Sequence, residues 1–109
     1  MKCLIAAALV ATCQPALAES EIDTLMAIGR PIYETRCAEC HSKGGGGFIG
    51  PSFHGNTRIA NDELVLRQIN RGGADMPAFG KKLTPEEILA VGTYIRNSWG
   101  NAFGVLVAE

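Results

Sequence analysis

The residues with the clearest chemistry lie in the run CAECH at positions 37–41. Two thiols separated by two residues and followed directly by an imidazole form the C-x-x-C-H pattern of covalent haem attachment. Cys37 and Cys40 can add across the two vinyl groups of a haem, which gives thioethers that do not dissociate. Because two intervening residues in a helical turn span the vinyl positions, His41 then lies under the iron as a proximal ligand. The motif therefore predicts one covalently bound haem c.

Two other uses of a C-x-x-C pair fit this chain less well. A thioredoxin-like dithiol follows a strand in an α/β pattern, whereas this motif follows a segment of helical character. A structural zinc ion takes four ligands, and beyond the motif residues 19–109 offer only His54 among cysteines and histidines. Haem attachment is therefore the preferred interpretation.

The second axial position of the iron requires a further side chain. Met76 lies in the segment GGADMPAFG, residues 72–80, where Pro77 favours an extended Met76 and the glycines allow close approach to a ring. A thioether at this position is a known haem ligand. Met26 and His54 are the alternatives, and we expect His54, in a glycine-rich loop, to bond to solvent or backbone. The predicted iron ligands are therefore His41 and Met76.

The N-terminus has the pattern of a secretory signal peptide. A positive start is followed by the apolar run CLIAAALVA, residues 3–11, then by Pro15 and the small-x-small motif at 16–18. The apolar run is shorter than the ~20 residues that span a bilayer. We therefore expect a signal peptide over 1–18, cleaved after Ala18, and export to the periplasm. Lipidation at Cys13 and a buried N-terminal helix are the alternatives.

The remaining residues, 19–109, are predicted to form one domain with no transmembrane segment. Without Lys2 they carry nine basic against 11 acidic side chains, so there is no basic field suited to nucleic acid. Their only thiols are Cys37 and Cys40, and an exported free pair would be prone to oxidation. A domain of this size has a small core, which a covalently bound macrocycle would enlarge.

The local patterns indicate an all-α fold of three or more helices. Residues 20–38 have mixed helical spacing, interrupted by Pro31, so that the helix either starts near Arg30 or is kinked there. Residues 61–70 form a second candidate, with Asn61 as N-cap and a stop at Gly72-Gly73. A third begins at Thr84 with a capping box and is expected to end at Gly100. Long loops join them.

With these features, residues 29–100 resemble class I cytochrome c. The resemblance rests on Gly29 and Tyr33 before the C-x-x-C-H motif, on Gly50-Pro51, on Met76-Pro77, and on Tyr94 in the last helix. It implies an all-α fold wrapped around one haem in a crevice, with one haem edge exposed. It also implies that the Pro51 carbonyl accepts a bond from His41 and so orients it, and that Gly29 contacts Tyr94.

The resemblance implies a single-electron carrier rather than an enzyme, because a His/Met-ligated iron has no open position. The expected partners are periplasmic redox proteins: a dehydrogenase or reductase on one side and a terminal oxidase on the other. A dedicated haem subunit, or direct acceptor, of one periplasmic dehydrogenase is the alternative, and a haem enzyme or gas-binding sensor would require that Met76 not bind iron.

Three further expectations concern the surface and the lining of the crevice. A modestly positive docking face could be formed by basic residues beside the ligands: Lys43, Arg71, Lys81 and Lys82. The apolar residues expected to keep the iron dry are Phe48, Ile49, Phe53, Leu64, Phe79, Leu83, Ile95 and Trp99. The apolar tail, residues 101–109, is expected to cover the side of the core away from the haem, with a docking strip as the alternative.

Overall fold

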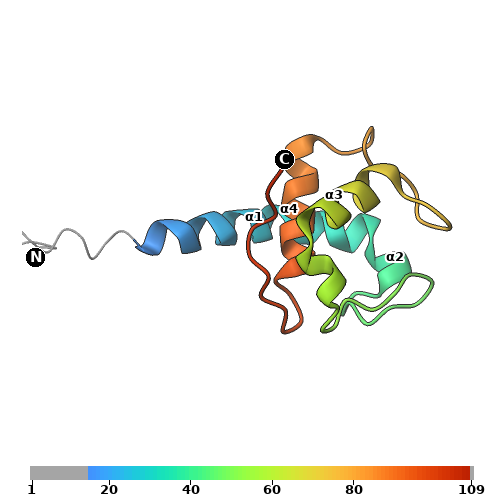
Figure 1. Cartoon of the computed structure of the whole chain (residues 1–109), viewed down its shortest axis with the longest axis horizontal. Coiled ribbons are helices and arrows are strands. Elements are labelled where there is room, and N and C mark those ends of the chain that lie inside the picture. Colours follow the sequence, from blue (N-terminus) through green and yellow to red (C-terminus); the bar gives the residue numbers. More distant parts are fainter. Residues whose placement is uncertain (1–14, 109) are drawn as a thin grey trace, which may run out of the picture.

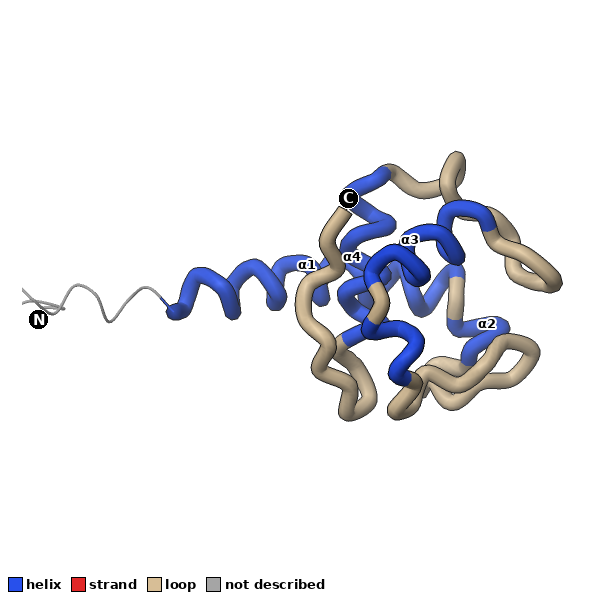
Figure 2. Tube along the Cα trace, viewed as in Figure 1, coloured by secondary structure: helices blue, strands red, loops and turns tan. Residues whose placement is uncertain are grey.

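The computed structural model describes residues 15–108, and their side chains from Glu21 onwards. Helices and loops make up this part of the chain, without a strand (Figure 2), which confirms the all-α prediction. The elements are α1 (Pro15–Arg36), α2 (Ala38–His41), the 3-10 helix η2 (Thr57–Ala60), α3 (Asp62–Arg71) and α4 (Pro85–Arg96). The apolar run of the predicted signal peptide, Cys13 and residue 109 lie outside the described residues.

The first helix continues through its proline. α1 runs unbroken from Pro15 to Arg36 with Pro31 inside it, which excludes a start near Arg30, one of the two alternatives that the sequence left open. The missing N–H of Pro31 leaves one helical bond unmade, but the ring is exposed and clashes with no neighbouring element. No helix in the described part of the chain is both long and apolar enough to cross a bilayer. α1 begins before the predicted cleavage site, and its N-terminal half projects from the rest of the molecule (Figure 1).

The starts of α3 and α4 agree with the sequence patterns. The Asn61 side chain accepts a bond from the Leu64 N–H at the start of α3, and Gly72 with positive φ ends that helix. Thr84 and Glu87 form the reciprocal capping box of α4. The end of α4 differs from the prediction, because the helix stops at Arg96 rather than near Gly100. The chain turns there because the Asn97 amide bonds to the backbone of both Thr93 and Gly104.

The main helix contact joins α1 to α4. Gly29 is buried against the backbone of Ala90 and the Cβ of Tyr94, so that even an alanine side chain would collide there. This is the contact that the family resemblance implied. Tyr33, one turn further along α1, is fully buried and packs against Tyr94 with ring centroids 5.5 Å apart. The α1–α4 pair therefore forms a closely packed, rigid core from which the loops extend.

The C-terminal tail, residues 101–108, runs along α4 on the side away from the long loops (Figure 1). Leu106 is 2% exposed and lies over Gly92, where a Cβ would displace it. Its N–H donates to Thr93 Oγ1, and the next N–H, from Val107, donates to Asp62 Oδ2. Asp62 also accepts from Arg96, which is 3% exposed. The tail thus covers the core, as expected, and links α3 to α4.

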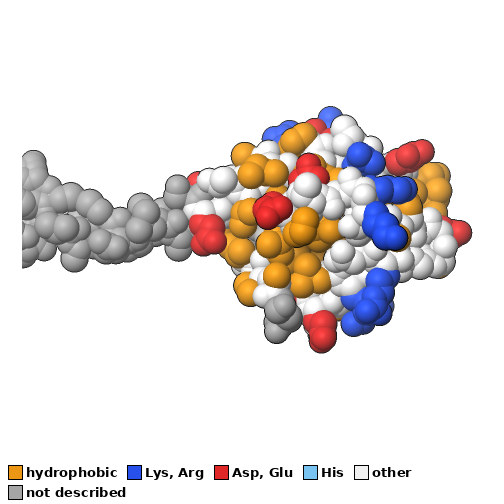
Figure 3. Space-filling model, turned by 90° about the horizontal axis from the view of Figure 1, so that it is seen from above, with side chains coloured by type: hydrophobic (Ala, Val, Ile, Leu, Met, Phe, Trp, Pro, Cys, Tyr) orange, Lys and Arg blue, Asp and Glu red, His pale blue; other side chains and the backbone are white. Residues whose placement is uncertain are grey.

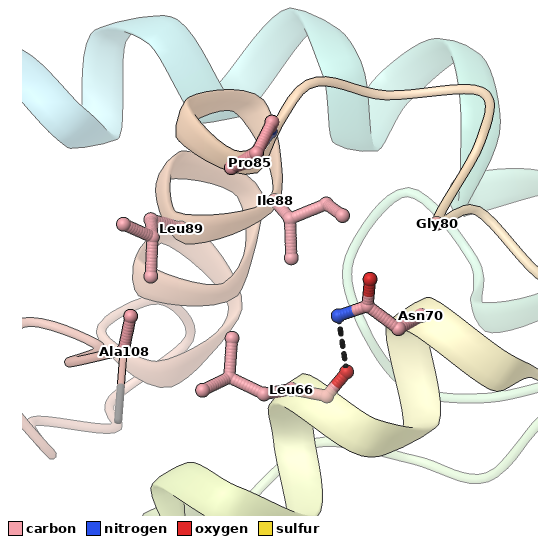
Figure 4. Close-up of a pocket in the computed structure, with 7 residues that line it drawn as sticks. All are labelled: Leu66, Asn70, Gly80, Pro85, Ile88, Leu89 and Ala108. Atoms are coloured by element: carbon pink, nitrogen blue, oxygen red, sulfur yellow. Dashed lines mark hydrogen bonds between the residues drawn. The ribbon is translucent and has the colours of Figure 1, made fainter.

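A small cavity of about 200 Å³ lies between α3, α4 and the end of the tail (Figure 4). Apolar side chains line most of it, including Leu66, Ile88 and Leu89. Its one side-chain amide, Asn70, is already engaged through a bond from Nδ2 to the Leu66 carbonyl at 2.8 Å. Because no titratable or metal-binding side chain lines it, we interpret this cavity as a gap in the packing between the two helices and not as a binding site.

Candidate haem-binding site

The larger cavity, of about 430 Å³, opens where two long loops project from the helices. In Figure 1 these loops, residues 42–56 and 72–83, extend from the same side of the molecule on either side of α2. The cavity is lined by residues from five separate stretches of the chain. Cys37, Cys40, His41, Pro51 and Met76, the residues predicted from sequence, all lie in its wall.

The C-x-x-C-H motif forms a helical turn at the end of α1. The Cys37 N–H donates to the Tyr33 carbonyl, and the His41 N–H donates to the Cys37 carbonyl at 3.0 Å, so the turn is closed by backbone bonds. Both cysteines are free thiols. Burial raises the pKa of Cys37 to about 11, with a smaller opposing effect of Arg36. The two sulfurs therefore lie on one short, rigid turn at the cavity wall, as attachment to a single group requires.

The His41 imidazole is held from two sides. Its Nδ1 lies 2.9 Å from the Pro51 carbonyl oxygen, and since a carbonyl only accepts, Nδ1 carries the proton. The other ring nitrogen, Nε2, then has its lone pair free for a metal. Gly50 has no side chain because the ring lies directly against it, and a Cβ there would be 2.7 Å from Nδ1. The Phe53 ring stacks on the imidazole with centroids 4.4 Å apart.

Met76 is held in a tight backbone turn. Its N–H donates to the Gly73 carbonyl at 2.8 Å, and its carbonyl accepts from the Gly73 N–H at 2.9 Å. Gly72 and Gly73 both have positive φ, and a Cβ at Gly72 would collide with the backbone of Met76 and Pro77. This geometry explains why glycines precede the methionine.

One contact of Met76 was missed by the sequence analysis. The Gln68 side chain, from α3, donates from Nε2 to Met76 Sδ at 3.5 Å, and it lines the same cavity. Gln68 lies eight residues before Met76, on a helix whose pattern otherwise indicates a solvent-facing position. Gln68 and Met76 come into contact only because the chain reverses direction after Gly72 and folds back along α3.

Several expected lining residues are in place and two are not. The expectation was correct for a set of apolar residues that do line the cavity: Ile49, Phe53, Leu64, Phe79, Leu83 and Ile95. Phe48 is instead 78% exposed. Trp99 packs on the far side of Phe53 and lies against Gly45, where a side chain would collide with the indole. Its position after the end of α4 turns it away from the cavity.

The remaining candidate ligands lie elsewhere. His54 is exposed, lines no part of the cavity, and its Nε2 lies 2.6 Å from the Gly44 carbonyl, as expected for a loop histidine bonded to backbone. Met26 is on α1 and is also outside the cavity wall. The four basic residues of the expected docking face are exposed, and none of them lines the cavity.

The chemistry of the cavity fits a c-type haem. Two thiols, one imidazole with a free nitrogen and one thioether lie in the wall of a single space whose surface is mostly apolar. A porphyrin needs apolar walls, and its iron accepts nitrogen and thioether ligands. The four side chains thus match, in type and number, what this group requires.

Sequence comparisons place the chain among haem proteins. A profile of the family described as "Cytochrome C oxidase, cbb3-type, subunit III" matches residues 24–95. Cytochrome c6 from Rippkaea orientalis is 36% identical over 76 residues, which cover 63% of this chain and 67% of that protein. The cytochrome c subunit of the quinone alcohol dehydrogenase from Gluconacetobacter polyoxogenes is 32% identical over 88 residues, covering 67% of this chain and 19% of the subunit.

Structural comparisons give the same result. Cytochrome cL from Methylophaga aminisulfidivorans superposes with a TM-score of 0.61 at 26% identity, covering 68% of this chain and 55% of the other. For cytochrome cL from Hyphomicrobium denitrificans the TM-score is 0.62 at 25% identity, with 70% and 48% covered. The chain thus spans about half the length of the cytochrome cL structures that it matches. From the profile match, the relatives and the shared fold, the chain belongs to the cytochrome c family, as a class I c-type cytochrome of the electron-carrying kind.

Proposed function

We propose that this chain binds one haem c through thioethers at Cys37 and Cys40, with His41 and Met76 as the axial iron ligands, and carries single electrons between periplasmic redox proteins. The observation that carries the proposal is the convergence of these four side chains on one apolar cavity. The haem would supply an iron that cycles between the ferric and ferrous states. The protein would supply ligands, orientation and exclusion of water.

Each residue of the site has a separate task in this proposal. The Pro51 carbonyl holds the proton on His41 Nδ1, which leaves Nε2 as the ligand and fixes the plane of the ring. The turn at Gly73 presents Met76, and the Gln68 amide orients its sulfur. A thioether ligand favours ferrous iron and so raises the reduction potential relative to a second histidine.

The closed coordination of the iron is the reason for proposing a carrier rather than an enzyme. If His41 and Met76 both bind the iron, no position would remain for a substrate or a gas. Phe53, Phe79 and Ile95 wall the cavity with apolar surface, which keeps water away and limits the rearrangement that accompanies electron transfer.

Carbon monoxide provides the test of this closed site. The native ferrous protein is expected not to bind it, because both axial positions are filled, whereas the Met76→Ala variant is expected to bind it readily. The Soret absorption band reports binding in both proteins. Rapid binding by the unmodified protein would overturn the carrier proposal in favour of a haem enzyme or gas sensor.

A dedicated link to one dehydrogenase is the second candidate function. Its support is that a relative is the cytochrome c subunit of a quinone alcohol dehydrogenase. Co-purification of a dehydrogenase subunit with the native chain would favour this candidate over a freely diffusing carrier between a dehydrogenase or reductase and a terminal oxidase.

We also propose that the chain is exported and cleaved after Ala18. The mass of the secreted protein tests this directly. A mature chain that begins at Glu19 and carries one haem is expected, whereas a lipid on Cys13 would add an acyl mass and retain the residues that follow it.

A further inference from the structure

An exposed aromatic side chain lies at the tip of the loop that follows the haem-binding motif. Phe48 is 78% exposed and its neighbour Ile49 is 59% exposed. The other large apolar side chains with such exposure in the described residues are Ile28, on α1, and Val107, in the tail. Two of these four exposed apolar side chains, Phe48 and Ile49, are therefore neighbours at the tip of this loop. Ile49 also lines the larger cavity.

The tip is held rigidly. The Gly47 N–H donates to the His41 carbonyl at 2.9 Å, and the Gly50 N–H donates to the Cys40 carbonyl at 2.8 Å. Between these anchors the Phe48 N–H donates to the Gly50 carbonyl at 2.9 Å. The loop is therefore bonded directly to the C-x-x-C-H turn, and the backbone at Phe48 is held in place. An aromatic side chain has only two rotatable bonds, so it loses little entropy when it binds a partner.

Two side-chain hydrogen bonds also tie the loop tip to the helices. The Ser42 hydroxyl donates to the Gly47 carbonyl at 2.7 Å, and the buried Tyr33 hydroxyl donates to the Ser42 carbonyl at 2.6 Å. Gly47 has a positive φ of 94°, and a Cβ there would lie 2.8 Å from the Ser52 nitrogen. The outward position of Phe48 is thus set by bonds that reach the helix core.

The wall of the larger cavity contains equal numbers of basic and acidic side chains. The ionisable side chains in its wall, other than the proposed haem ligands, are Arg36, Arg58, Glu39 and Asp75, two of each sign, and all four are exposed. Outside the cavity wall, Figure 3 shows Lys and Arg side chains gathered in a band near the end of the molecule that carries the loops, with acidic and apolar side chains beyond them. The wall of the cavity itself therefore offers a partner no single sign of charge.

We infer that Phe48, with Ile49 beside it, is the anchor by which redox partners dock at the haem edge, and that the matching partner surface is apolar and nearly uncharged. This inference rests on the proposed function, because the tip matters only if electrons leave through this cavity. It differs from the expected docking by a positive face, whose basic residues are exposed but do not line the cavity.

A gold electrode coated with a methyl-terminated alkanethiol monolayer is the probe for such a partner surface. The holoprotein is expected to adsorb there with its haem electrically connected, and to prefer this surface to a carboxylate-terminated one. Phe48→Ser should weaken adsorption about tenfold, the change expected when one phenylalanine side chain no longer leaves water. Phe48→Leu should retain most of the binding.

Val107→Ser is the matched control, because it removes a similarly exposed apolar side chain (56%) from the C-terminal tail, which runs along α4 on the side away from the long loops. It should adsorb like the unmodified protein, and both serine variants should keep the same absorption spectrum and midpoint potential. Equal adsorption of Phe48→Ser and the unmodified protein, or equal loss in both serine variants, overturns the inference. Absence of haem from the chain would instead contradict the proposed function, so the two failures are distinguishable.

Discussion

The side of the molecule that contains the cavity is held mainly by backbone hydrogen bonds, whereas the side covered by the tail is held by buried side chains. Around the cavity, glycines let loop 42–56 fold tightly against the C-x-x-C-H turn and loop 72–83 fold against the end of α3 (Figure 2). On the other side, Leu106 and Arg96 are almost completely buried. Substitutions on the first side should therefore change the iron site more than stability, and those on the second should do the reverse.

Leu106→Ala is expected to have the largest effect, and on stability alone. Removing this buried side chain opens a cavity over Gly92 and should lower the free energy of unfolding by about 2–5 kcal/mol. Urea unfolding followed by circular dichroism measures the loss, and Val107→Ala, at an exposed neighbour, is the control. A changed visible spectrum in the folded Leu106→Ala protein would contradict the separation of the two sides.

The ion pair on the tail side predicts a pH dependence. The bond from Arg96 lowers the pKa of Asp62 below the usual range of an aspartate, with a further contribution from the Val107 N–H. Because the folded pKa is the lower one, this stabilisation is complete above about pH 4 and is lost as the pH falls through the folded pKa. Asp62→Asn should lose about 2 kcal/mol at neutral pH, and less in acid. A difference between the two proteins that does not shrink below pH 4 would be inconsistent with this cause.

Gly50→Ala tests the close approach on the cavity side. A methyl group there would push the His41 ring, so we expect a loss of about 1–3 kcal/mol together with an altered absorption spectrum. Gly44→Ala is the matched control, since a Cβ at that position would meet no atom within 4 Å. If the two alanine variants have the same spectrum, Gly50 does not position the ligand.

Gln68→Leu should have the smallest effect on stability and a specific effect on the iron. Loss of a bond to the Met76 sulfur, worth about 1 kcal/mol, should raise the fraction of dissociated methionine roughly fivefold and lower the midpoint potential. Voltammetry measures the potential, with Arg67→Leu, on the exposed part of the same helix, as control. An unchanged potential would show that the amide does not influence the ligand.

Features that depend on neighbouring residues were predictable from the sequence. The caps at Asn61 and Thr84 and the spacing of the haem motif are local, because each is specified by residues within a few positions of one another. Continuation of α1 through Pro31 was left open, since the cost of a proline in a helix depends on what the helix packs against.

Features that depend on the path of the chain were not predictable. The contact between Gln68 and Met76, the exposure of Phe48 and the placement of Trp99 behind Phe53 all follow from how loops return to the helices. The hydrophobic periodicity and the capping residues of the sequence do not indicate how a loop packs back against the helices. The general course of the tail was anticipated from its apolar composition, but the network of Arg96, Asp62 and the backbone of the tail was not.

The most direct test of the proposed site is the weak far-red charge-transfer absorption band of ferric haem with a methionine ligand. The unmodified ferric protein should show this band, Met76→Ala should lack it, and Met26→Ala, in which the methionine of α1 is replaced, should keep it. Absence of the band from the unmodified protein, or its survival in Met76→Ala, would contradict the assignment of Met76 as the second iron ligand.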